Sequence, residues 1–134
     1  MPFHAVSSGV DAEAFKRALV TAVNEASAAG IDVIFLVPTL HNVDSDAIVE
    51  VFGKQRVDAF KRQREMTVND VKFHLETSLT KRARGPAIVL GIYLSLDKLG
   101  KAIKDHRTKD WVYLPWSEPE LASYVIGHPA SVAI

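Results

Sequence analysis

Residues 31–38 read IDVIFLVP, an apolar run interrupted only by Asp32 and closed by Pro38. Branched and aromatic side chains follow one another without the alternation of a half-exposed strand. That pattern is typical of a parallel strand covered by helices on both faces. Residues 87–95 (AIVLGIYLS) and 111–116 (WVYLPW) repeat it. The three runs therefore predict the central strands of a mainly parallel sheet.

Amphipathic segments separate these runs and predict helices. Residues 11–29 carry an apolar stripe at helical spacing that stops at Gly30. Further helices are expected at residues 46–52, 55–65, 97–107 and 117–126. Buried strands alternating with helices predict one three-layer α/β/α domain over residues 1–134, with a mainly parallel sheet of about four strands.

One further strand, residues 71–77 (VKFHLET), alternates apolar and polar residues and is expected near a sheet edge. Its polar face would carry Lys72, His74 and Glu76. The loop that leads to residues 87–95 is shorter than the dozen or more residues that a parallel crossover usually takes. We therefore expect residues 71–77 to be the one antiparallel strand, paired with residues 87–95.

Composition excludes several classes of protein. The 134 residues include no cysteine, so a disulfide scaffold, a thiolate metal site and a cysteine nucleophile are excluded. The apolar runs are far shorter than the ~20 residues that span a bilayer, and residues 1–10 lack the pattern of a secretory signal. We expect a soluble, cytoplasmic protein without a membrane partner. No GxSxG, GxGxxG or metal-ligand spacing occurs, so no catalytic residue, metal or cofactor is assigned and the question of enzyme activity stays open.

Charge is unevenly distributed although the net charge is zero. Residues 54–84 contain nine basic and four acidic residues. The densest basic positions are Arg62, Arg64, Lys81, Arg82 and Arg84, which would bind an acidic protein or an anionic ligand. The alternative is a solvated helix face followed by a charged loop.

Polar residues follow the apolar strands, where open α/β sheets bind ligands. They are His41, Asn42, Asp44, Asp97, Trp116 and Ser117. His41 with Asp44 would form a base and its orienting acid, or hold a hard cation together with Asp46 and Asp97. The alternative is that Asp44 or Ser45, Ser95 and Ser117 cap the helices that begin there.

Three functions are compatible with these patterns. The first is an interaction or regulatory domain that binds a macromolecular partner through residues 54–84. The second is a domain that binds a small ligand or nucleotide at the ends of the strands. The third, ranked last because the chain is not basic overall, is a nucleic-acid-associated protein. A homodimer would form through residues 71–77 or the apolar tail 131–134. The predicted core comprises Ile34, Leu36, Val89, Tyr93, Val112 and Leu114.

Overall fold

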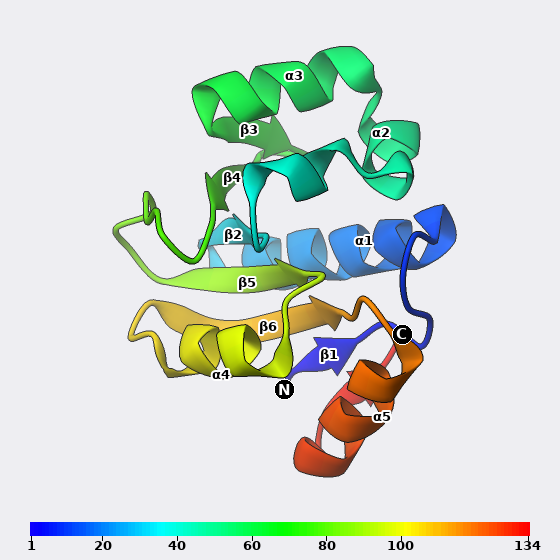
Figure 1. Ribbon diagram of the computed structural model, residues 1–134. Coiled ribbons are helices and arrows are strands. Elements are labelled where there is room, and N and C mark those ends of the chain that lie inside the picture. Colours follow the sequence, from blue (N-terminus) through cyan, green and yellow to red (C-terminus); the bar gives the residue numbers. More distant parts are fainter.

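The computed structural model describes residues 1–134 as a mixed α/β fold with one seven-stranded sheet and five α-helices (Figure 1). The strands are β1 (Phe3–His4), β2 (Asp32–Leu36), β3 (Glu65–Val68), β4 (Val71–Glu76), β5 (Ala87–Ile92), β6 (Thr108–Leu114) and β7 (Val132–Ala133). The helices are α1 (Ala12–Ala29), α2 (Asp46–Phe52), α3 (Lys54–Gln63), α4 (Leu96–Lys104) and α5 (Glu118–Gly127), with a 3₁₀ helix, η1 (Leu40–Asp44), after β2. None of the helices combines the length and the apolar composition needed to cross a membrane.

The strand order is β3-β4-β2-β5-β6-β1-β7, and every neighbouring pair is parallel except β3 with β4. The expectation of about four strands was too low. The antiparallel strand is β3, whereas residues 71–76 run parallel to β2. The sequence reading missed β3, which pairs with β4 through a tight turn at Asn69 and Asp70. Both turn residues have positive φ, 47° and 66°, as a two-residue hairpin requires.

The predicted pairing of residues 71–77 with residues 87–95 was also wrong, because β2 lies between β4 and β5. Residues 77–86, hereafter the crossing segment, pass over β2 without forming a helix. Thr77 and Thr80 close a tight turn with two backbone hydrogen bonds. The six residues that follow can span about 20 Å when extended, at ~3.3 Å per residue, which is about the length of a strand, so a parallel connection needs no helix here. Since β3 flanks β4, a dimer through the edge of residues 71–77 is ruled out. The tail remains at an edge, as β7.

One side of the sheet packs against α1, α2 and α3. Phe35 of β2 is fully buried and contacts Phe15 of α1, Phe52 of α2 and Phe60 of α3, with ring centroids 5.4–6.4 Å apart. Alternate residues of β5 and β6, including Leu90 and Val112, join the same cluster. This aromatic centre explains why the first three helices pack together on one side of the sheet.

The intervening residues of the strands face the other helices. Tyr113 of β6 packs with Leu99 of α4 and Tyr124 of α5. In Figure 1 α1 lies behind the sheet and α4 in front of it. Ile34 and Val89 point to this second side and form a small cluster with Ala87 and Ala83.

Five of the six predicted core residues are buried, and Leu36 is the exception. Ile34, Val89, Tyr93, Val112 and Leu114 are at most 5% exposed. Leu36 is only partly buried, because α4 and the crossing segment do not meet above it. The helix expected over residues 97–107 ends earlier, at Lys104, so His106 lies beyond α4 and its side chain is 92% exposed.

His74 and Glu76 are buried although their alternation suggested a polar surface. The Nε2 atom of His74 lies 2.8 Å from the Oδ2 atom of Asp32, and Glu76 forms an ion pair with Arg107. Neighbours on both sides of β4 cover these two side chains.

Side-chain caps begin most helices, as the sequence indicated. Asp11 accepts hydrogen bonds from the N–H groups of Glu13 and Ala14, and Gly30 ends α1 in the left-handed conformation. Ser45, Ser95 and Ser117 cap α2, α4 and α5. For these three serines the capping interpretation is confirmed.

Candidate functional site: the crossing segment and the groove beside it

The crossing segment starts at the carboxyl end of β4 and ends at the beginning of β5. It replaces the helix that usually connects parallel strands. Its only buried residue is Ala83, which packs on Ile34, Ala87 and Val89. Lys81, Arg82 and Arg84 on either side of Ala83 are exposed. A single small apolar side chain thus holds the middle of the segment against the sheet.

A buried ion cluster, formed by Glu76, Asp105 and Arg107, fixes the crossing segment; we call it the Arg107 cluster. The two Nη atoms of Arg107 donate to the Glu76 carboxylate at 2.8 and 3.0 Å. Its Nε and Nη2 atoms donate to Asp105 at 3.1 and 3.0 Å, and Nη1 also donates to the carbonyl oxygen of Ala83 at 2.7 Å. All five N–H groups of the guanidinium are therefore used, and none is left for a ligand.

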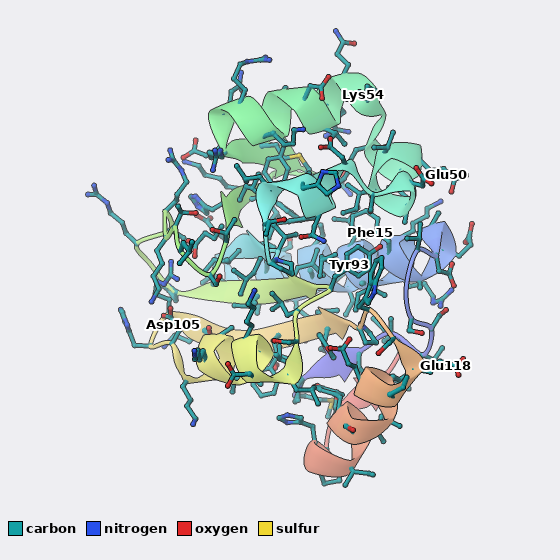
Figure 2. The ribbon with its side chains drawn as sticks, viewed as in Figure 1. Phe15, Glu50, Lys54, Tyr93, Asp105 and Glu118 are labelled. Atoms are coloured by element: carbon teal, nitrogen blue, oxygen red, sulfur yellow. The ribbon has the colours of Figure 1, made fainter.

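Glu76 also binds the backbone of the crossing segment directly. Its Oε2 atom accepts hydrogen bonds from the N–H groups of Arg82 and Ala83, at 2.9 and 2.8 Å. Lys81 adds an ion pair to Asp105 at 3.1 Å, and Figure 2 labels Asp105 on the same side of the molecule as the crossing segment in Figure 1. The chain is thus held by its main chain while its long cationic side chains remain outside.

Charge and hydrogen bonding keep this cluster ionised. Burial alone would raise the pKa of Glu76, but hydrogen bonds from Arg107, Arg82 and Ala83 outweigh it and hold the pKa below its ordinary value. The hydrogen bond from Arg107 likewise holds the pKa of Asp105 well below its usual range. Hydrogen bonds to Glu76 and then Asp105 raise the pKa of Arg107. The cluster therefore carries fixed charges at neutral pH.

A groove with a cavity of about 370 Å³ lies between the crossing segment and α4. Ile34, Leu36 and Val89 form its apolar floor. The crossing segment provides one wall and α4 the other, while the Arg107 cluster closes one end. The groove exists because an extended segment is thinner than a helix and covers less of the sheet.

The basic residues singled out in the sequence come from two elements that pack on opposite faces of the sheet: α3 packs on Phe35, and the crossing segment packs on Ile34 and Val89. Arg62 and Arg64 belong to the end of α3, whereas Lys81, Arg82 and Arg84 belong to the crossing segment, and these last three are hereafter the basic surface. Arg64 ends α3 in the left-handed conformation, and its carbonyl oxygen accepts a hydrogen bond from Leu75 N–H at 2.9 Å. This bond places the end of α3 beside the end of β4, where the crossing segment begins; Figure 1 shows both on the same side of the molecule.

Two of the polar residues predicted as a ligand site after β2, Asn42 and Asp44, form hydrogen bonds within the protein. Both oxygens of Asp44 accept from Lys61 Nζ, at 2.7 and 2.9 Å, and this hydrogen bond lowers the pKa of Asp44. Asn42 Oδ1 accepts from the backbone N–H and the hydroxyl of Thr39, at 3.0 and 2.9 Å. His41 is exposed. Asp44 thus pairs with Lys61 rather than with His41.

The other three residues predicted for the ligand site, Asp97, Trp116 and Ser117, each contact different parts of the protein. Asp97 lies on α4 at the groove and pairs with Lys101 at 3.5 Å. Trp116 is 51% exposed and packs nearly perpendicular to the Tyr93 ring, with centroids 4.9 Å apart. Ser117 caps α5. No group of three or more His, Cys, Asp or Glu side chains is placed to hold a metal ion, so the proposed cation site of His41, Asp44, Asp46 and Asp97 does not form.

Comparisons with known proteins were made against family models, curated proteins and solved structures. No family model, curated protein or solved structure matches this chain. The geometry of this chain is therefore the only basis for the function proposed below.

Sequence reasoning missed the Arg107 cluster and the groove. A signal for the cluster was present: Glu76 ends one strand and Arg107 immediately precedes another. Pairing them requires the strand order, because Glu76 and Arg107 come from β4 and from the start of β6, with β2 and β5 between those strands. The groove has no sequence signal of its own, since it follows from the absence of a helix in the crossing segment.

Proposed function

We propose that this chain is an interaction domain that binds an acidic protein partner through the basic surface. The observation that carries the proposal is the crossing segment, whose backbone is fixed by the Arg107 cluster while Arg82 and Arg84 remain exposed. Two sequence expectations belong to the same proposal: a single domain with helix layers on both faces of the sheet, and a cytoplasmic location.

Preorganisation favours binding at this surface. A flexible basic loop loses conformational entropy when it binds a partner, and that loss reduces affinity. Here the buried Ala83 and the hydrogen bonds from Arg82 N–H and Ala83 N–H to Glu76 have already fixed the main chain. Only the side chains of the arginines remain to be ordered.

The charges of this surface are available to a partner. Arg82 and Arg84 are exposed and form no ion pair within the chain. Arginine binds carboxylates with two parallel hydrogen bonds, so these two arginines are suited to an acidic protein segment. Leu79, in the turn that precedes these residues, is 93% exposed and offers an apolar contact in the same segment.

The test uses a fluorescein-labelled oligoglutamate peptide and fluorescence anisotropy. We expect the peptide to bind and its affinity to fall steeply with salt, because exposed charges are screened beyond ~8 Å at physiological ionic strength. The double variant Arg82→Glu with Arg84→Glu should abolish binding. It leaves the fold intact, since both side chains are exposed and Glu76 binds only the backbone at Arg82.

The matched control reverses two exposed charges elsewhere. Lys16→Glu with Arg17→Glu lies on α1, outside the basic surface, and changes the net charge by the same amount. Equal loss of binding in both double variants would show that only net charge matters and would refute the proposal. Tighter binding of a short DNA duplex than of the peptide would instead favour the nucleic-acid function.

A further inference from the structure

Three exposed apolar side chains gather beyond the carboxyl end of β6; we call them the Trp116 patch. Trp116, Val6 and Val10 are each more than half exposed. The N–H of Gly9 donates to the carbonyl oxygen of Pro115 at 3.0 Å, so the segment that carries both valines lies against the segment that carries Trp116. Exposed apolar residues around a tryptophan are typical of the centre of a protein interface.

The end of the sheet that carries this patch also presents free carboxylates. Because β2, β5 and β6 are parallel, the helices that follow them begin at the same end of the sheet. Asp46 in the first turn of α2 and Glu118 in the first turn of α5 are exposed and form no ion pair within the chain. We call these two residues the acidic rim. On α1, Lys16 and Arg17 offset the charge of Glu13, so α1 is left out of the rim.

The basic surface lies at the opposite end of the same sheet. Arg84 precedes β5, whereas Tyr93, on which Trp116 packs, follows it. The six residues of β5 span about 20 Å at ~3.3 Å per residue. Figure 1 shows the crossing segment on the left and the start of α5 on the right, where Figure 2 labels Glu118. The basic surface and the acidic rim therefore cannot meet within one copy of the chain.

The crossing segment complements the Trp116 patch and the acidic rim in chemistry. Leu79 is almost fully exposed and offers an apolar contact, and Arg82 and Arg84 are unpaired cations. A guanidinium stacks well on the face of a tryptophan ring, and it also binds carboxylates with two parallel hydrogen bonds. The protein therefore carries a basic segment with one apolar side chain, and an apolar patch with acidic neighbours, at opposite ends.

We propose that the acidic partner of the basic surface is a second copy of this chain, bound head to tail. The crossing segment of one copy lies on the Trp116 patch and the acidic rim of the next. This inference rests on the proposed function, because it uses the same basic surface. The contact joins two different surfaces, so each pair keeps one free surface of either kind and further copies can add.

The first test follows self-association by sedimentation velocity over a range of protein concentrations. We expect the average mass to rise with concentration in low salt and to return to that of the monomer at about 0.5 M salt, where exposed charges are screened within a few ångströms. Trp116→Ala changes no charge and should weaken the association by about tenfold, as expected for a tryptophan at the centre of an interface.

Two double variants test whether the two ends meet. The basic-end variant, Arg82→Glu with Arg84→Glu, and the acidic-end variant, Asp46→Lys with Glu118→Lys, should each be monomeric, because like charges then face each other. An equimolar mixture of the two should associate again, since the reversed end of each variant complements the reversed end of the other.

The matched control reverses two acids outside the acidic rim. Glu25→Lys with Asp58→Lys changes the net charge as much as the acidic-end variant does, and the two residues lie on α1 and α3, away from the carboxyl end of the sheet. This control variant should associate as the unmodified protein does. Thermal melts of all variants show that each is folded.

Three results would overturn the proposal: a monomeric protein at every concentration in low salt, no association in the mixture of the two folded variants, or a control variant as monomeric as the acidic-end variant. The oligoglutamate peptide separates these results from the proposed function. If the peptide binds and the copies do not associate, the head-to-tail contact is wrong and the proposed function stands. If the peptide does not bind and the copies do not associate, both are wrong.

Discussion

Arg107 is the residue whose replacement we expect to destabilise the fold most through charge. Arg107→Met removes five hydrogen bonds and leaves the Glu76 carboxylate buried without a counter-charge. Breaking a buried pair by removing one partner costs about 3–5 kcal/mol, so we expect a loss of that size in the free energy of unfolding. Urea denaturation followed by tryptophan fluorescence measures it. Adding Glu76→Leu to this variant should restore part of the loss, because the unpaired charge is then gone; an equal or larger loss would contradict this account.

Phe35 and Leu36 are neighbours in sequence that face opposite sides of the sheet, which makes them a matched pair. Phe35 is fully buried among three other phenylalanines, so Phe35→Ala should lower the free energy of unfolding by about 3–5 kcal/mol. Leu36 borders the groove and is partly exposed, so Leu36→Ala should cost at most about 2 kcal/mol. The same urea experiment compares them, and an equal cost for both would mean that the groove is closed in solution.

Among the elements, the contact of β1 with the chain after α5 should make stability depend on pH. His4 of β1 is buried, and its Nδ1 atom lies 2.8 Å from the Ser131 hydroxyl oxygen. Burial lowers the pKa of His4 below the ordinary value of 6.5, so the unfolded chain binds a proton more readily than the folded one. Stability from this site is complete above pH 6.5 and is lost as the pH falls. Glu76 and Asp105, whose pKa values are also lowered, add a second loss below their ordinary values of 4.5 and 3.8.

Thermal melts between pH 8 and pH 3 test both steps. His4→Gln should remove most of the change in melting temperature around pH 6 and leave the loss below pH 4.5 in place. If the melting temperature of His4→Gln still falls around pH 6, that loss of stability comes from another histidine.

Elements were predictable where local patterns decide them, and pairing was not. The helix over residues 12–29 has its apolar stripe and its Gly30 stop in the sequence itself. The position of β4 depends on β2, which lies far away in the chain, and on how a short extended segment crosses the sheet. The same limit applied to the site: the cations of the crossing segment were visible in the sequence, whereas the partner of Glu76 and the groove required the topology.

For the whole molecule, zero net charge predicts a solubility minimum near neutral pH, where electrostatic repulsion between copies is weakest. Solubility measured against pH in low salt should therefore show its lowest value around pH 7. The double variant Arg82→Glu with Arg84→Glu makes the protein acidic and should move that minimum to lower pH. A minimum that stays in place would mean that a local surface, and not net charge, controls association.

The way the crossing segment is held also bears on its digestion by trypsin, which cuts after lysine and arginine. Lys81, Arg82 and Arg84 are exposed, and from sequence alone this stretch is the natural place for a first cut. A protease needs a segment that opens locally, and the bonds from Arg82 N–H and Ala83 N–H to Glu76 oppose such opening. We expect the native protein to resist cleavage here and Glu76→Gln to be cut faster at the same sites, as seen by mass spectrometry, because the amide offers fewer acceptor positions. Cleavage between residues 81 and 84 would then show that the crossing segment, which connects β4 to β5, has separated from Glu76 while the rest of the chain is still folded.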